Sequence, residues 1–348
     1  MIRVYDDTKV FVQCPAGACT GGAELLHQIV SFLRDKGLDA YIVYFGEGDK
    51  SLPSDYSKYN IEIAEAVSNE PHDISVLYEA TMYQVAENTK IQKILWWLSV
   101  DNYFTSGRDV ALIDLFDFNI KMGLKTLVRR AGKFLIKGRN DFSKSVSLHS
   151  MSKKDVVCCY QSEYAHHFLL NNGFREMLPL KDYINTDHIK PVNKLGRENI
   201  VLYNPKKGFE FTRKLIAQSP DIDWRPIQGM TRSQLISLMA KSKVYIDFGN
   251  HPGKDRLPRE CAMNGLCVIT GSRGSARYFE DVWLENKYKF DEHKAKKEDI
   301  ISRIREVLKN YENAIDDFAF YRHRIALEKE EFENQLAELF KLESNINE

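Results

Sequence analysis

Residues 244–281 read VYIDFGNHPGKDRLPRECAMNGLCVITGSRGSARYFED, and this stretch decides the fold. An apolar run at 244–246 meets Asp247 and a turn rich in glycine and proline, as at the end of a buried parallel strand. We expect a helix over 257–263 and a second buried strand over 266–270. Two strand–loop–helix steps in so short a segment predict a doubly wound α/β sheet, whose ligands bind beyond the carboxyl ends of the strands.

Cations gather in the loops of this segment. They are Lys254, Arg256, Arg259 and Arg273. The amino-terminal end of the expected helix also has backbone N–H groups without partners inside the helix, and these groups favour an anion. The sequence therefore predicts a phosphate-bearing ligand at these loops.

The same residues carry a family resemblance. GKDRLPRE at 253–260, followed by a helix of small residues and by CVITG, resembles the carboxyl-terminal nucleotide-sugar site of GT-B glycosyltransferases, particularly bacterial group 1 enzymes of surface polysaccharide assembly. Many retaining members have two glutamates eight positions apart, and Glu260 matches the second. Pro252 stands at the position of the first, which leaves a retaining or an inverting outcome open.

The resemblance implies an α/β chain with two Rossmann-like, doubly wound domains that face a cleft. A length of 348 residues suits two domains of ordinary size. We expect an acceptor domain at 1–185, a polar linker at 186–198, a nucleotide-sugar domain at 199–320 and a closing helix at 321–348 that returns to the first domain.

The first domain is expected to contribute a glycine-rich loop. A strand at 10–14 leads into PAGACTGG at 15–22, which opens a helix. The loop lacks the GxGxxG and P-loop patterns, so on its own it is equally a tight strand-to-helix connection. The resemblance implies that Gly21 and Gly22 face the donor's phosphates. Glu24 either contacts ligand or complements the helix dipole.

A second strand end in this domain resembles a site. Further strands are expected at 40–45, 74–79, 93–100 and 155–160, the last being the final strand of the domain. The strand at 93–100 delivers Asp101, which suits a ligand site and a helix cap equally well. Its WWLSVDNY motif resembles that of bacterial glycosyltransferases. Asp101 is therefore the candidate for acceptor contact or general base, with Glu24 as the other candidate base.

The second domain supplies the other donor-binding candidates. A strand at 199–203 leads into NPKKG, and although lysine pairs usually lie on solvated surface, the resemblance implies that Lys206 and Lys207 bind the diphosphate. It also implies that Glu260 binds the nucleotide ribose and that residues near two further loops contact the donor. These residues are Gly229, Met230, Thr231, Gly253, Lys254, Asp255 and Arg256.

Residues 120–137 have the pattern of a basic amphipathic helix. Apolar residues recur at helical spacing at Ile120, Leu124, Leu127, Val128, Ala131, Phe134 and Leu135, and a neighbouring stripe holds Lys121, Lys125, Arg129, Lys133 and Lys137. Arg130, Arg139 and Lys144 add positive charge. The pattern suits either a core helix with a solvated cationic face or, over 120–144, a surface that docks on anionic lipid.

Composition excludes several classes of function. Lys+Arg and Asp+Glu both number 49, which gives no support for binding nucleic acid along the whole chain. The amino terminus lacks the apolar core of a signal peptide, and there is no run of about 18 apolar residues to span a bilayer. We expect a cytoplasmic protein, with a peripheral position on the inner face of the plasma membrane if the helix docks. The 6 cysteines lack the spacing of a zinc site and are expected to be reduced, mostly buried thiols.

The expected function is transfer of a sugar from a nucleoside-diphosphate donor, such as a UDP sugar, to a saccharide or lipid-linked saccharide acceptor. Fixed positive charge would stabilise the leaving diphosphate without a metal or other cofactor. A catalytically silent nucleotide-sugar binding protein is the alternative, because the first glutamate is missing. A dehydrogenase is disfavoured because there is no dinucleotide fingerprint. The sequence leaves the donor sugar, the base, the acceptor and the oligomeric state open.

Overall fold

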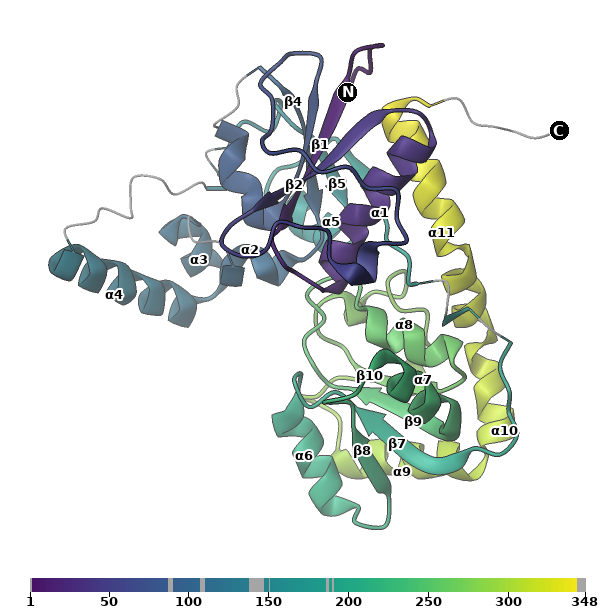
Figure 1. Cartoon of the computed structure of the whole chain (residues 1–348). Coiled ribbons are helices and arrows are strands. Elements are labelled where there is room, and N and C mark those ends of the chain that lie inside the picture. The colour runs from purple at the N-terminus through teal and green to yellow at the C-terminus, as the bar shows by residue number, and fades with distance from the viewer. Residues whose placement is uncertain are drawn as a thin grey trace. The chain divides into compact units, whose positions relative to one another are not determined.

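The computed structural model describes residues 2–86, 90–106, 110–137, 147–149, 151–185, 188–189 and 191–342. The chain forms two compact units, and each is built on one parallel sheet (Figure 1). The first unit comprises Met1–Gln161, Ala165–Lys181 and Phe332–Glu348, and the second comprises Ser162–Tyr164 and Asp182–Glu331. The prediction of two doubly wound α/β domains is confirmed.

The sheet of the first unit has six strands in the order β2-β1-β3-β4-β5-β6. They are β1 (Lys9–Pro15), β2 (Asp39–Phe45), β3 (Ile74–Tyr78), β4 (Gln92–Trp97), β5 (Val157–Tyr160) and β6 (Met177–Pro179). All neighbours are parallel, and the central strands are buried along most of their length because helices cover both faces. Since β2 and β3 flank β1 on opposite sides, the winding of the chain reverses there. The topological switch point therefore lies between β1 and β3.

Helices complete the first unit. They are α1 (Gly21–Asp35), α2 (Val100–Ser106), α3 (Leu112–Phe118), α4 (Ile120–Lys137) and α5 (Glu163–Asn171), with the short 3₁₀ helices η1 (Ser54–Tyr56) and η2 (Glu79–Ala86). The bounds of α4 are those predicted. No helix among the described residues is both long enough and apolar enough to cross a bilayer.

Two sequence predictions need correction in the first unit. The strand predicted over 93–100 ends at Trp97, and Val100 and Asp101 instead begin α2. The strand at 155–160 is also not the last, because β6 pairs in parallel with β5. β6 contains only three residues and ends at Pro179, so it shows no periodicity that a sequence pattern could detect.

The carboxyl-terminal helix α11 (Ala319–Phe340) adds its last turns to the first unit. Trp96 is fully buried, and its indole Nε1 donates a 2.8 Å hydrogen bond to the Leu180 carbonyl. The Phe332 ring of α11 lies 6.4 Å from the Trp96 ring, measured between centroids. This buried aromatic contact anchors the end of the chain to the first unit.

The second unit has a five-stranded parallel sheet in the order β11-β10-β9-β7-β8. The strands are β7 (Glu198–Tyr203), β8 (Asp223–Pro226), β9 (Ser242–Asp247), β10 (Cys267–Gly271) and β11 (Lys289–Phe290). The helices are α6 (Phe209–Gln218), α7 (Arg232–Lys241), α8 (Arg256–Met263), α9 (Lys297–Lys309), α10 (Tyr311–Ala314) and the first part of α11, with the short 3₁₀ helices η4 (Ser275–Arg277), η5 (Asn286–Tyr288) and η6 (Ile315–Phe318). Because β8 and β9 flank β7 on opposite sides, the switch point lies between β7 and β9.

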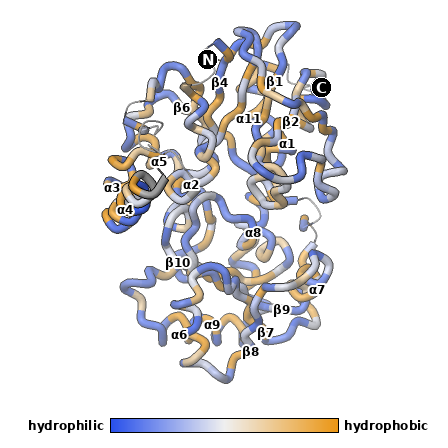
Figure 2. Tube along the Cα trace, turned by 60° about the vertical axis from the view of Figure 1, so that its left-hand side comes forward, coloured by the Kyte–Doolittle hydropathy of each residue, from blue (hydrophilic) through white to orange (hydrophobic). Residues whose placement is uncertain are grey.

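The buried core follows the hydrophobic strands, which Figure 2 shows in orange at the centre of each sheet. Val244, Ile246, Val268 and Ile269 have at most 1% of their surface exposed. Five of the six cysteines are buried and Cys19 is exposed, and all six are free thiols, as predicted. Burial raises the pKa of the Cys159 thiol to about 12, so that thiol is neutral at ordinary pH.

Candidate functional site

The loops after β7 and β9 meet at the switch point of the second sheet. A Cβ atom added to Gly208 would lie 2.3 Å from the Phe248 carbonyl oxygen, and one added to Gly249 would lie 2.6 Å from Cβ of Lys207. Gly208 also has a φ of 62°, in the left-handed region. Only glycine permits so close an approach of the two backbones. The loops are therefore held together where a doubly wound sheet binds its ligand.

The loop after β10 packs against the loop after β9. The Ser275 N–H donates a 2.9 Å hydrogen bond to the His251 carbonyl, and the Ser275 hydroxyl donates a 2.6 Å bond to the Gly253 carbonyl. Gly274 lies so close that an added Cβ would be 2.0 Å from the His251 carbonyl oxygen. These contacts fix the backbone of residues 251–253.

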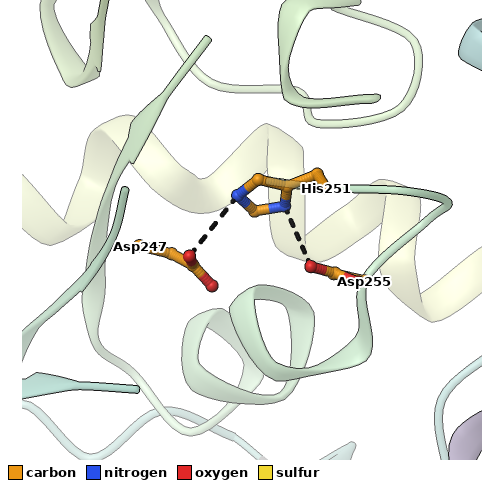
Figure 3. Close-up of side chains that lie close together, drawn as sticks. All are labelled: Asp247, His251 and Asp255. Carbon is orange, nitrogen blue, oxygen red and sulfur yellow. Dashed lines mark ion pairs between the residues drawn. The ribbon is translucent and has the colours of Figure 1, made fainter. Parts of the chain in front are cut away.

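Asp247, His251 and Asp255 form a buried group beneath these loops (Figure 3). The imidazole ring lies between the two carboxylates, with Nε2 3.6 Å from Oδ1 of Asp247 and Nδ1 3.2 Å from Oδ2 of Asp255. Asp247 also accepts hydrogen bonds from the Tyr245 hydroxyl at 2.8 Å and from the Gly249 N–H at 2.9 Å. Burial and the neighbouring Asp247 charge hold the pKa of Tyr245 well above its ordinary value, so its hydroxyl remains a donor.

One ligand atom from each of these three residues lies within 4.8 Å of the others. Among the described residues, this group has the spacing that a metal ion would need. The orientation of the three side chains is less suitable for a metal ion. The two ring nitrogens face different carboxylates across the ring, and Lys207 Nζ already lies 2.7 Å from Oδ2 of Asp255. A single ion could engage only one nitrogen, so the arrangement is better described as a series of polar contacts that runs from Asp247 through His251 and Asp255 to Lys207.

Lys254 and Arg259 point into the interior of the second unit. Lys254 Nζ lies 2.7 Å from Oε1 of Glu328, and Arg259 is bonded to Glu328 and, through both carboxylate oxygens, to Asp182 at 2.7 and 2.9 Å. All four side chains have at most 2% of their surface exposed. These two cations of the motif therefore have buried anionic partners, which join the start of α8 to α11 and to Asp182.

The remaining predicted residues of this motif lie closer to the surface. Arg256 is the first residue of α8, with Nε 3.8 Å from Oδ2 of Asp182 and 13% of its side chain exposed. Glu260 has 18% of its side chain exposed and lies 3.8 Å from the His188 ring. Gly253 is buried in the preceding turn.

Four further predicted residues lie at the carboxyl ends of the neighbouring strands of the same sheet. Lys206 is exposed, and its N–H donates to the Asn204 side chain. Gly229 has a φ of 64°, and Met230 is 39% exposed. Thr231 caps α7 through a reciprocal pair of hydrogen bonds with Gln234. The structure thus brings the predicted donor loops to one end of one sheet.

The first unit places its predicted residues at the carboxyl ends of β1 and β4. Gly21 and Gly22 begin α1, which Thr20 caps. No atom lies within 4 Å of a Cβ added to Gly22, so crowding does not explain this glycine. Glu24 accepts a 2.8 Å hydrogen bond from Tyr59, and Lys58 lies 3.6 Å away. Asp101 lies half-buried in the first turn of α2.

The sequence prediction missed Glu79, which directly follows β3 beside the switch point of the first sheet. Its side chain is buried, and Oε2 accepts a 3.0 Å hydrogen bond from the Leu98 N–H, just before α2. Burial raises the pKa of Glu79 to about 8, although hydrogen bonds from the Leu98 and Ser99 backbone oppose the rise. The only signal in the sequence was an acid directly after an apolar strand.

Comparison with known proteins gives the class of fold. The sequence matches no protein-family model and no curated protein. Sucrose-phosphate synthase from Thermosynechococcus elongatus is similar in structure, with a TM-score of 0.61 at 11% identity over 96% of this chain and 98% of that one. HepE from Anabaena, in complex with UDP and glucose, has a TM-score of 0.60 at 10% identity over 95% and 98%.

WaaG, a glycosyltransferase involved in lipopolysaccharide biosynthesis, has a TM-score of 0.56 at 11% identity, and the match covers 97% of this chain and all of WaaG. These matches extend over nearly the whole length of both chains. The fold is that of the GT-B glycosyltransferases, as the GKDRLPRE motif predicted.

Proposed function

We propose that this protein is a glycosyltransferase that moves a sugar from a nucleoside-diphosphate donor to a saccharide or lipid-linked saccharide acceptor in bacterial cell-surface polysaccharide synthesis. The observation that carries the proposal is the glycine-mediated contact of the loops after β7 and β9, which brings Lys207 to the switch point. HepE, which has the same fold, was solved with UDP-glucose. A UDP-hexose is therefore the first donor to test.

The proposed donor site uses fixed positive charge instead of a metal ion. As the bond between sugar and diphosphate breaks, negative charge grows on the leaving diphosphate. Lys206, Lys207 and the amino-terminal N–H groups of α8 would stabilise that charge more in the transition state than in the bound donor. Glu260 would accept hydrogen bonds from the ribose.

An inverting reaction would also need a base that takes the proton from the acceptor hydroxyl. Asp101 is the first candidate and Glu24, which accepts a hydrogen bond from Tyr59 and lies near Lys58, is the other. A half-buried carboxylate at the start of α2 is exposed enough to meet an acceptor.

Helix α4 supports the proposal that the acceptor is carried by a membrane. Its packed face is not the apolar stripe: Gly123 lies against Phe116 of α3, where an added Cβ would be 2.6 Å from the ring, and Arg130 is buried with Nη2 bonded to the Val110 carbonyl. The stripe faces outward, with Ile120 68%, Val128 70% and Leu135 83% exposed. Figure 2 shows hydrophobic and hydrophilic residues together along α4.

Exposed cations flank this stripe at Lys121, Lys125 and Arg129. An apolar stripe beside a cationic one is the pattern of a helix that lies in the plane of an anionic leaflet. We therefore propose that α4 docks the protein on the inner face of the plasma membrane. Arg139 and Lys144, which the sequence prediction included, lie outside the described residues.

A catalytically silent nucleotide-sugar binding protein is the second candidate, and Pro252 in place of the first glutamate favours it. Slow hydrolysis of the donor in the absence of acceptor distinguishes the two, because only an enzyme releases nucleoside diphosphate.

A thermal-shift screen tests the proposed function directly. A ligand that binds the native state stabilises it, and at a ligand concentration of 100 times the Kd the free energy of unfolding rises by about 2.7 kcal/mol. The melting temperature rises with it. We expect a shift with UDP, ADP or GDP and with a matching nucleotide sugar, and none with NAD. If no nucleoside diphosphate or nucleotide sugar shifts the melting temperature at millimolar concentration, the proposal is wrong.

A further inference from the structure

We propose that His251 is a positioning residue for donor binding. Its ring nitrogens lie within ion-pair distance of Asp247 and Asp255, although neither makes a hydrogen bond to a described residue, and this placement keeps the Asp255 carboxylate where that group orients Lys207 toward the donor's diphosphate. The inference rests on the proposed function, because it assigns His251 a part in the same donor site.

The contacts form one chain from the interior to the surface. It runs from Asp247 through His251 and Asp255 to Lys207, with separations of 3.6, 3.2 and 2.7 Å between the paired atoms. The exposed fractions of the side chains along it are 2%, 0%, 17% and 36%. Only the last members reach solvent. The inferred route from the buried end to a ligand runs through Asp255 and Lys207.

Hydrogen bonds hold the buried end of this series of contacts in place. Asp247 is held by the Tyr245 hydroxyl and the Gly249 N–H, and the His251 backbone is held by Ser275. Imidazole carries a nitrogen on each side of one flat ring, and both nitrogens are donors when the ring is protonated, so a protonated ring can contact two carboxylates at once. Glutamine can replace one such contact but not both with the same geometry.

The next residue in this series of contacts is Asp255, and the orientation of its carboxylate is informative. It occupies the N-cap position of α8, where an aspartate ordinarily accepts hydrogen bonds from the first helical N–H groups. Its side chain makes no capping hydrogen bond here. The third helical residue, Pro258, has no N–H group to accept one from, and the carboxylate is instead turned toward His251 and Lys207.

The same arrangement restrains the Lys207 side chain. A lysine side chain is flexible and loses conformational entropy when a ligand orders it. Holding Nζ at 2.7 Å from Asp255 before the donor arrives reduces that loss. Without His251, the Asp255 carboxylate would keep its contact with Lys207 but lose the neighbour that fixes its own position, and Nζ of Lys207 would be less well oriented.

The test compares UDP with uridine, because only UDP has a diphosphate. We expect His251→Gln to weaken UDP binding in calorimetry roughly tenfold while uridine binding changes little. Combined with Asp255→Ala, the His251→Gln substitution should have no further effect, because His251 acts through Asp255. Additive losses in this double-mutant cycle, or equal losses for UDP and uridine, would overturn the inference.

Controls separate positioning from folding. His27→Gln is the matched variant, since His27 is also fully buried and contacts partners through both ring nitrogens at 2.7 Å. It should lower the melting temperature without changing the ratio of UDP to uridine affinity. If His251→Gln does not fold, Tyr245→Phe removes one donor to Asp247 with little change of shape and should lower UDP affinity in the same direction, and an unchanged affinity would overturn the inference.

Two further outcomes separate this inference from failure of the proposed function and from metal binding. If wild-type protein binds no nucleoside diphosphate at all, the proposed function and this inference are both wrong, whereas wild-type binding of UDP with an unchanged His251→Gln affinity overturns the inference alone. If EDTA lowers UDP affinity and zinc restores it, Asp247, His251 and Asp255 hold a metal ion, and the positioning role is wrong. We expect EDTA to leave UDP affinity unchanged.

Discussion

Lys254 and Glu328 form an ion pair almost completely removed from solvent, with 2.7 Å between Nζ and Oε1 and exposed side-chain fractions of 1% and 0%. Lys254 belongs to the motif that resembles a donor site, yet its ammonium faces α11. Leaving a buried charge fully unpaired costs about 3 to 5 kcal/mol, and removal of Lys254 should cost less than this because Glu328 keeps Arg259 as a partner.

The first prediction follows from this pair. Lys254→Met should lower the free energy of unfolding, by less than the full cost of an unpaired buried charge, as measured by urea denaturation. Combining it with Glu328→Met should cost less than the sum of the two single substitutions, because the double variant buries no unpaired charge from this pair. A stable Lys254→Met protein with weak UDP binding would show instead that Lys254 acts on the donor.

Glu260 gives the second prediction. Glu260→Gln keeps the shape of the side chain and removes its charge, and hydrogen bonds to charged groups contribute about 1.5 to 3 kcal/mol. Affinity for UDP should therefore decrease roughly tenfold or more in calorimetry. Glu298→Gln, at an exposed position of α9, is the control and should change nothing. An unchanged affinity in folded Glu260→Gln protein would remove Glu260 from the site.

The lysines after β7 give the third prediction. Lys207→Ala should reduce turnover of the nucleotide sugar more than it reduces uridine binding, because the lysine acts on charge that grows as the diphosphate leaves. Lys206→Ala should have a smaller effect, since Lys206 is exposed and Lys207 is paired with Asp255. Lys214→Ala, on the exposed side of α6, should be neutral. Equal loss of uridine and donor binding would contradict the assigned role.

Glu79 gives a pH dependence of stability. Its pKa is about 8 in the folded protein against an ordinary value of 4.5, so the folded state keeps a proton that the unfolded chain has already lost. Its contribution to stability is complete below pH 4.5 and is lost as the pH rises to about 8, by at most about 1.4 kcal/mol per pH unit.

Glu79→Gln removes this titration. The stability of the variant relative to wild type should therefore rise between pH 5 and about pH 8 in urea denaturation. Glu176→Gln, at an exposed position of the same unit, should follow the wild-type curve. Parallel curves for wild type and Glu79→Gln would show that Glu79 is not held protonated.

Local pattern predicted the ends of β1, β7, β9 and β10 to within one residue, because each combines an apolar run with a glycine-containing turn, but it extended β4 beyond Trp97 and did not detect β6. The GKDRLPRE motif likewise located α8 and its loop. The partners of that motif were not predictable, because Asp182 lies 77 residues from Arg259 and Glu328 lies 69 residues from it. Periodicity also identified the apolar stripe of α4 but not its environment. Gly123 lets Phe116 approach the opposite side of the helix, and the stripe is left exposed.

Docking of α4 on anionic lipid is the last prediction. Exposed Lys121, Lys125 and Arg129 should each contribute up to about 1 kcal/mol near an anionic leaflet, and the exposed apolar stripe should add shallow insertion. In co-sedimentation the protein should bind vesicles that contain phosphatidylserine but not vesicles of neutral lipid, and added salt should weaken the binding because it screens the charges.

Changing the three cations to Gln should abolish the dependence on anionic lipid, and changing Val128 and Leu135 to Ser should weaken binding at every salt concentration. Changing Lys36, Lys50 and Lys90, which lie elsewhere on the first unit, to Gln keeps the same net charge as the first variant and should leave binding intact if the site is α4. Equal binding to both kinds of vesicle would contradict electrostatic docking, and a dimer that dissociates when the stripe is changed would show that a second copy of the chain covers this face.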